Sequence, residues 1–196
     1  MMRIYVTTCI GYLSIIFIFG CTEKKTEQTE MVSSRQYILA MIQMEVEAGN
    51  PDANLERAAN RIAIASENGA DIALLPEVMD LGWTDPSAKT MAYEIPDGKT
   101  CLKLRNAAAK YGIYVCAGII EKEDDKTYNA AVIIDPSGEV ILKHRKINEL
   151  DIAHDLYDLG DRLNVVKTPL GTLGLYICAD ATAPGNALSN SLGLLG

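Results

Sequence analysis

The apolar positions of the chain alternate between strand-length runs and helical spacing, and these patterns predict its elements. Residues 37–44 and 70–75 are apolar runs of strand length, and the second is apolar on both faces, as expected of a parallel strand covered by helices. Between them, Asn50-Pro51 is a typical helix start, and apolar residues then recur at helical spacing until Asn68-Gly69. We therefore expect a β-α-β unit with a buried first strand.

The same patterns continue to the end of the chain. A second helix over 100–111 is expected to end at Gly112, and Cys116 is expected in the core of the strand that follows. The remaining expected elements are a loop over 78–98, strands over 113–120, 127–135 and 140–146, a charged turn over 121–126, a tight turn at Pro136–Gly138, an irregular loop over 147–162, and a hairpin of 163–168 with 172–178. The order indicates an α/β domain with a mixed sheet.

Residues 1–20 have a different pattern, which is typical of a signal peptide. A short positive start precedes an uncharged apolar run that is slightly short for a membrane span. The sequence Ile18-Phe-Gly-Cys21 resembles the lipobox of bacterial lipoproteins, in which the signal is cut before a cysteine that then carries acyl chains. The resemblance implies a lipidated Cys21, a polar linker over 21–36, and a domain anchored by lipid to a membrane of the cell envelope, on the periplasmic or extracellular side. The alternative is an uncleaved membrane anchor with an incidental cysteine.

Composition narrows the function. The 196 residues carry a formal net charge of −8, and no basic stripe is available to meet phosphates, which argues against a nucleic-acid partner. The sequence has only two histidines and no Cys-x-x-Cys pair, which argues against a zinc site. After removal of the signal and lipidation of Cys21, three cysteines remain, so an oxidising compartment would leave at least one free thiol.

Three polar residues mark strand ends. Glu77 follows the strand over 70–75, Lys146 ends the strand over 140–146, and Cys178 ends the strand over 172–178. Taken alone, each has an ordinary structural explanation: a cap for Glu77, a solvated side chain for Lys146 and a core position for Cys178. Ligand sites of α/β sheets gather beyond the carboxyl ends of strands, so these three side chains are also placed to converge.

The chemistry of the three groups is complementary. A thiol is a weak nucleophile until a base or a positive charge assists it, and a carboxylate can be that base. An ammonium can hold the oxyanion that forms when sulfur attacks a carbonyl or nitrile carbon, and the backbone N–H of Ala179 could be a second donor.

Three motifs carry a resemblance to a known family. Ala73-Leu-Leu-Pro-Glu77, Lys143-His-Arg-Lys146 and Gly174-Leu-Tyr-Ile-Cys178-Ala-Asp180 resemble, in order, the motifs of the nitrilase, or carbon–nitrogen hydrolase, superfamily. The resemblance runs from about Tyr37 to the end of the chain. It implies an α-β-β-α sandwich with mixed sheets and a catalytic triad of Glu77, Lys146 and Cys178. It also implies hydrolysis of a small-molecule amide or nitrile through a cysteine thioester, with no cofactor and no metal.

The sequence departs from the family pattern in two places. Members often carry a second glutamate in the loop after the lysine, and here Glu149 or His154 is expected at that place and near the substrate. In the family, the helix after the cysteine leads into further strands and helices. The domain over 37–196 is therefore expected to lack its C-terminal part, including part of the surfaces through which relatives form homo-oligomers.

The sequence thus predicts a thiol amidohydrolase, and two alternatives stay open. One is a catalytically inactive, truncated remnant or binding protein tethered to a membrane. The other is an amine N-acyltransferase of the same superfamily, because the same thioester could transfer its acyl group to an amine instead of water.

Overall fold

The computed structural model describes residues 36–196, and every structural statement here concerns that part of the chain. The predicted signal peptide over 1–20, the lipidation site Cys21 and nearly all of the predicted linker lie outside the described residues. Within residues 36–196, no helix has the length and apolarity that crossing a membrane requires.

A five-stranded mixed sheet forms the centre of the domain. Its strands lie side by side in sequence order, and β1, β2 and β3 are parallel whereas β4 and β5 run antiparallel to their neighbours. The β3–β4 hairpin is the longest pairing and turns at Asp124-Asp125. The strands are β1 (Leu39–Met41), β2 (Ile72–Leu74), β3 (Tyr114–Glu123), β4 (Lys126–Ile134) and β5 (Val140–Arg145).

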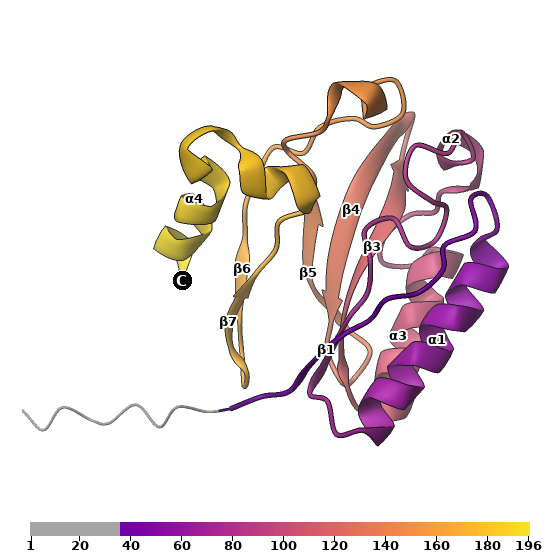
Figure 1. Ribbon diagram of the computed structural model, residues 1–196, viewed down its shortest axis with the longest axis vertical. Helices are drawn as coiled ribbons and strands as arrows, with labels where there is room; N and C mark the ends of the chain where they lie inside the picture. The colour runs from indigo at the N-terminus through magenta and orange to yellow at the C-terminus, as the bar shows by residue number, and fades with distance from the viewer. Residues whose placement is uncertain (1–35) are drawn as a thin grey trace, which may run out of the picture. The chain divides into compact units, whose positions relative to one another are not determined.

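Two helices cover one face of this sheet (Figure 1). Helix α1 (Pro51–Glu67) is capped by the Asn50 side chain, and α3 (Lys99–Tyr111) ends at Gly112, whose left-handed backbone closes it. Both present an apolar stripe to the sheet and form the main core with its strands. A third helix, α2 (Ala88–Met91), is a single turn inside the segment predicted as loop.

A second, smaller sheet covers the other face. Strands β6 (Val165–Thr168) and β7 (Gly171–Gly174) form an antiparallel hairpin, and a second apolar cluster fills the space between this hairpin and the large sheet. Helix α4 (Ala187–Leu195) packs on the hairpin, where Leu192 meets Gly174. The layers are therefore helix, sheet, sheet and helix, which confirms the predicted α-β-β-α sandwich (Figure 1).

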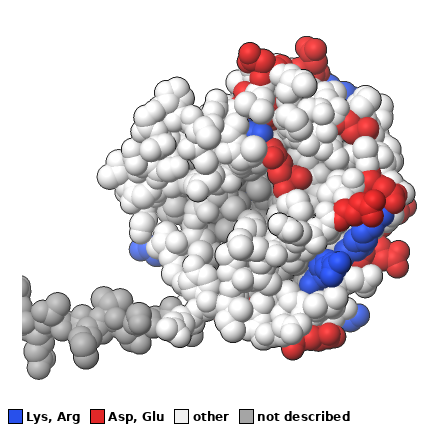
Figure 2. Space-filling model, in the orientation of Figure 1, with Lys and Arg blue, Asp and Glu red and all other residues white. Residues whose placement is uncertain are grey.

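The outer layer of the hairpin and α4 is almost uncharged. Figure 2 shows acidic side chains gathered over the opposite side of the same view, whereas this part is nearly white. Helix α4 contains no charged residue, and Leu194 is 89% exposed. Apolar side chains thus remain in contact with solvent at this edge of the sandwich.

Three predicted elements were wrong in detail. The strand over 37–44 shortens to β1 at the sheet edge, where Met41 is 76% exposed, so it is not the buried strand that was expected. The charged turn over 121–126 shrinks to two residues because Glu121 lies within β3 and pairs with cations of β5. The strand over 172–178 stops pairing at Gly174, and Cys178 instead begins the short 3₁₀ helix η2 (Cys178–Thr182).

We expect Gly118→Ala to destabilise the domain, because the chain after β2 passes closely over β3 at this glycine. A Cβ there would lie 2.6 Å from Cα of Glu77 and 2.8 Å from the carbonyl oxygen of Pro76. Overpacking against backbone should lower the free energy of unfolding by about 1–3 kcal/mol, measured by denaturant titration. Gly193→Ala in α4 is the control: nothing lies within 4 Å of its Cβ position, so no loss is expected there. Equal midpoints for G118A and the unmodified chain would contradict the close approach.

Candidate active site

Lys146 lies between two carboxylates directly after β5. Its Nζ is 2.7 Å from Oε1 of Glu77 and 2.8 Å from Oε1 of Glu149, and its side chain is 1% exposed. Burial opposes the charge on Lys146, but hydrogen bonds to Glu149 and Glu77 outweigh it and raise the pKa of the ammonium. The structure thus brings two of the three predicted triad residues into a buried ion pair.

Asn129 of β4 completes this cluster. Its Nδ2 donates to Oε1 of Glu77 at 2.7 Å and to Oε2 of Glu149 at 3.2 Å. Its carbonyl oxygen accepts from the backbone N–H of Lys146 at 2.9 Å. From the sequence, Asn129 is predicted only as part of the strand over 127–135, although an amide among buried residues was the signal that could have identified it.

Cys178 lies within electrostatic range of Glu77 and Lys146. The residue is exposed, unlike the buried Cys101 and Cys116. Partial burial of the sulfur raises the pKa of the Cys178 thiol, the negative charge of Glu77 and a hydrogen bond to it raise that pKa further, and the positive charge of Lys146 opposes them. Because the net shift is upward, the thiol favours its protonated form, and a base is needed to activate it.

The backbone at Cys178 adopts an uncommon conformation. Its φ of 42° lies in the left-handed region, which costs a residue with a Cβ about 1–2 kcal/mol. The N–H of Ala179 donates toward the sulfur and lowers the pKa of the thiol. The predicted oxyanion donor therefore lies beside the sulfur.

Asp180 ties the cysteine turn to the lysine loop. Its side chain is fully buried and accepts from the backbone N–H groups of Ile177, Ile147 and Asn148 at 3.0, 3.0 and 2.7 Å. His144 Nε2 lies 2.8 Å from its Oδ2. Burial opposes ionisation of Asp180, but the hydrogen bonds from His144, Asn148 and Ile177 prevail and lower the pKa of the carboxyl. This residue, which sequence reasoning did not identify as part of the site, fixes the position of Cys178 relative to Lys146.

The second glutamate of the site is Glu149. Its side chain is 1% exposed and contacts both Lys146 and Asn129. His154, the other candidate, has a side chain that is 48% exposed, and its ring nitrogens face the Glu149 carbonyl and Asp151 instead. Of the two candidates for the loop position, the structure places only Glu149 beside the triad.

The segment from Glu77 to Asp80 is anchored on β3. The carboxylate of Asp80 accepts the N–H of Ile120 with both oxygens at 3.2 Å, and burial raises the pKa of Asp80 to about 7. Val78 is fully buried and has a φ of 47°, which is rare for a β-branched residue. These contacts hold the backbone that follows Glu77 against β3.

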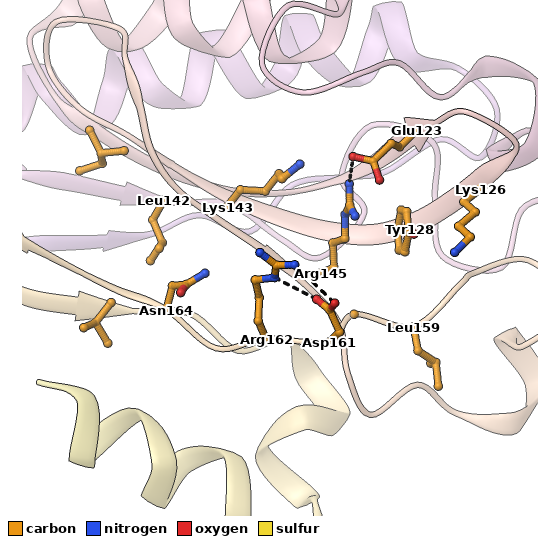
Figure 3. A pocket seen from close by; sticks show the side chains of 13 residues that line it. Glu123, Lys126, Tyr128, Leu142, Lys143, Arg145, Leu159, Asp161, Arg162 and Asn164 are labelled. Atoms are coloured by element: carbon orange, nitrogen blue, oxygen red, sulfur yellow. Dashed lines mark hydrogen bonds and ion pairs between the residues drawn. The ribbon is translucent and has the colours of Figure 1, made fainter.

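A cavity of about 860 Å³ lies beside β5, between this strand and the segment over 159–165. Figure 3 shows its charged lining, in which Arg145 pairs with Glu123 and Arg162 with Asp161. None of the three triad residues lines this cavity. Its volume therefore says nothing about the space available around Cys178. Among residues 36–196, no group of three His, Cys, Asp or Glu side chains is placed to hold a metal ion.

Comparisons with known proteins agree with the motifs. A family model described as carbon-nitrogen hydrolase matches residues 38–193. A protein named nitrilase from Pyrococcus abyssi is 34% identical over 158 residues, which cover 79% of this chain and 60% of that protein. The omega-amidase NIT2 of Mus musculus is 34% identical over 152 residues, covering 72% of this chain and 54% of its own length. The chain therefore spans only about half to three-fifths of these curated relatives.

Solved structures show the same fold. Nit3 of Saccharomyces cerevisiae, a member of branch 10 of the nitrilase superfamily, superposes with a TM-score of 0.70 at 26% identity, covering 80% of this chain and 62% of that one. An amidase of the nitrilase superfamily from Nesterenkonia AN1 gives a TM-score of 0.74 at 20% identity, covering 82% and 62%. Because the amidase is only 20% identical to this chain, its similarity shows a shared fold and nothing more.

We expect Glu77→Gln to accelerate alkylation of Cys178 by iodoacetamide. Glu77 raises the pKa of the thiol, so removing its charge lowers that pKa and increases the thiolate fraction at neutral pH, about tenfold for each pKa unit. Alkylation should be followed across pH by peptide mass spectrometry, which separates Cys178 from Cys101 and Cys116. Burial raises the pKa of these two thiols to about 11 and about 12, so they should react far more slowly.

Glu56→Gln is the matched control, because it removes the same charge from an exposed position on α1. Its Cys178 midpoint should equal that of the unmodified chain. A midpoint that stays unchanged in E77Q would show that Glu77 does not act on the sulfur.

Proposed function

Because this chain belongs to the carbon–nitrogen hydrolase family, we propose that it cleaves a non-peptide carbon–nitrogen bond of a small-molecule amide or nitrile through a cysteine thioester. One observation carries the proposal: a buried ammonium, Lys146, is shared by Glu77 and Glu149 and lies within electrostatic range of an exposed thiol. This arrangement offers a base, an electrophilic stabiliser and a nucleophile in one place.

In the first half of the reaction, Glu77 takes the proton of Cys178 while the sulfur attacks the amide carbon. A C–S bond forms, and the electron pair of the C=O bond moves onto oxygen. Lys146 and the N–H of Ala179 hold the developing negative charge. The raised pKa of the thiol makes Glu77 necessary as the base that takes its proton for the attack.

In the second half, Glu77 returns the proton to the departing nitrogen, the C–N bond breaks and ammonia or an amine leaves. A water molecule then loses a proton to Glu77 and attacks the thioester. The C–S bond breaks, Glu77 returns that proton to the departing sulfur, and a carboxylic acid is released. Every group in this route is a side chain or backbone amide of the chain, so the proposed route uses neither cofactor nor metal.

We further propose that residues 1–20 direct export and that Cys21 carries the lipid that anchors the domain to a membrane of the cell envelope. The apolar run and the Ile18-Phe-Gly-Cys21 sequence support this proposal. A cysteine bearing several acyl chains gives stable anchoring, which a single chain does not.

Turnover is tested by measuring ammonia release from a panel of small aliphatic amides, dicarboxylic acid monoamides and nitriles. We expect release with at least one class and its complete loss in Cys178→Ala, which removes the nucleophile. The control is Cys101→Ala, which removes a buried thiol away from the site and should keep activity if the variant folds. Repeating the assay with an added amine would show transfer of the acyl group as an N-substituted amide. Hydrolysis retained by C178A would refute the mechanism, and a folded chain that releases nothing would favour a binding role.

Lipidation is tested by growing bacterial cells that express the full chain with an alkyne-bearing fatty acid. The chain should acquire the label and fractionate with membranes, and Cys21→Ser should lose both properties. Cys9→Ser, within the same apolar run, is the matched control and should change neither. Labelling that persists in C21S would show that the anchor is not at this cysteine.

A further inference from the structure

Asn129 is a buried amide whose two N–H groups are both used within the ion cluster. It is 1% exposed, and Nδ2 has one hydrogen for Glu77 at 2.7 Å and one for Glu149 at 3.2 Å. Its own Oδ1 has no hydrogen-bond partner among the described residues. The Asn129 side chain therefore donates two hydrogen bonds to the carboxylates, while its own oxygen accepts none from the described residues.

The two carboxylate oxygens of Glu77 differ in their hydrogen-bond partners. Lys146 Nζ and Asn129 Nδ2 both contact Oε1, each at 2.7 Å. Among the described residues, no nitrogen donor contacts Oε2. Since Cys178 lies within electrostatic range of Glu77, Oε2 is the oxygen that remains available to interact with its thiol. Two donors converging on one oxygen restrict rotation of the carboxylate about its terminal bond.

A purely structural role explains Asn129 poorly. Burying an amide with an unpaired oxygen costs free energy, and an apolar side chain would fill the same place in β4 without that cost. The neighbouring residues of the strand, from Thr127 to Ile134, are all buried and mostly apolar. The position of the amide thus serves the carboxylates and not the packing of the sheet.

We infer that Asn129 is a positioning residue for Glu77, which together with Lys146 fixes Oε1, leaves Oε2 available to the thiol, and holds Glu149 on the same ammonium. The inference rests on the proposed function for its catalytic meaning. It assigns no contact between Asn129 and substrate. Its effect on the reaction passes entirely through Glu77.

Asn129→Leu keeps the branched heavy-atom skeleton of the side chain, although it is bulkier, and removes both donors. With one donor fewer on Glu77, the thiol experiences more negative charge, so the midpoint of Cys178 alkylation by iodoacetamide should move to higher pH. For any amide that the chain hydrolyses, kcat should fall roughly 10- to 100-fold with little change in KM, the range expected for a lost hydrogen bond to a charged group.

Thr127→Val is the matched control. Thr127 lies two residues earlier on the same face of β4, is equally buried, and its Oγ1 has no partner among the described residues. It contacts none of the charged groups of the site, so T127V should leave the alkylation midpoint and kcat unchanged.

The Glu77→Gln background separates positioning from structural damage. If Asn129 acts through Glu77, N129L should shift the midpoint when Glu77 is present and should not shift it further in E77Q, which is a non-additive cycle. A shift of equal size in both backgrounds, or no shift at all, would overturn the inference. Folding is checked by cooperative denaturant unfolding. Should N129L fail to fold, the smaller Asn129→Ser, which cannot reach both carboxylates, takes its place in the same cycle.

The two proposals fail in different ways. Absence of ammonia release from the unmodified chain, together with a Glu77-dependent midpoint shift in N129L, would reject the hydrolase and keep the positioning role. Full turnover together with an unshifted N129L would keep the hydrolase and reject the positioning role.

Discussion

The site depends on one buried ammonium that is shared by two carboxylates. Lys146 cannot be held at 1% exposure without a counter-charge, because an unpaired ammonium in the interior costs several kcal/mol. Glu77 and Glu149 provide that counter-charge twice over, so the three groups together carry one negative charge. Burial of the sulfur and the negative charge of Glu77 raise the pKa of the neighbouring thiol, so a base suits this site better than a pre-formed thiolate. Asn129 and the N–H groups around Asp180 then hold the charged groups in position.

The part of the structure that follows from periodicity was predictable. Apolar spacing located α1 and α3, and the residues beyond the apolar strands led to Glu77 and Lys146. The mixed sheet followed because helices joined the early strands and tight turns joined the later ones. These features depend on residues that are close in sequence, where propensity and turn chemistry act directly.

The part that was missed depends on contacts between distant segments. The choice of Glu149 over His154 is made by Lys146 and Asn129, which come from β5 and β4, and no local pattern in the loop distinguishes the two. The strand before Cys178 ends early because Asp180 accepts the N–H of Ile177 and turns the chain. The exposed β1 was expected to be buried because its composition is apolar, but it lies at the edge of the sheet. The catalytic assignment of Glu77, Lys146 and Cys178 itself remains a prediction until activity is measured.

The left-handed backbone of Cys178 means that reactivity and fold stability compete at this residue. A side chain with a Cβ is strained there, whereas glycine would relax the turn and lose the sulfur. The alanine variant keeps the Cβ and therefore the strain, which makes it a faithful background for trapping bound substrate. A glycine variant would relieve this strain, and the difference in unfolding free energy between the glycine and alanine variants would bound what the turn costs.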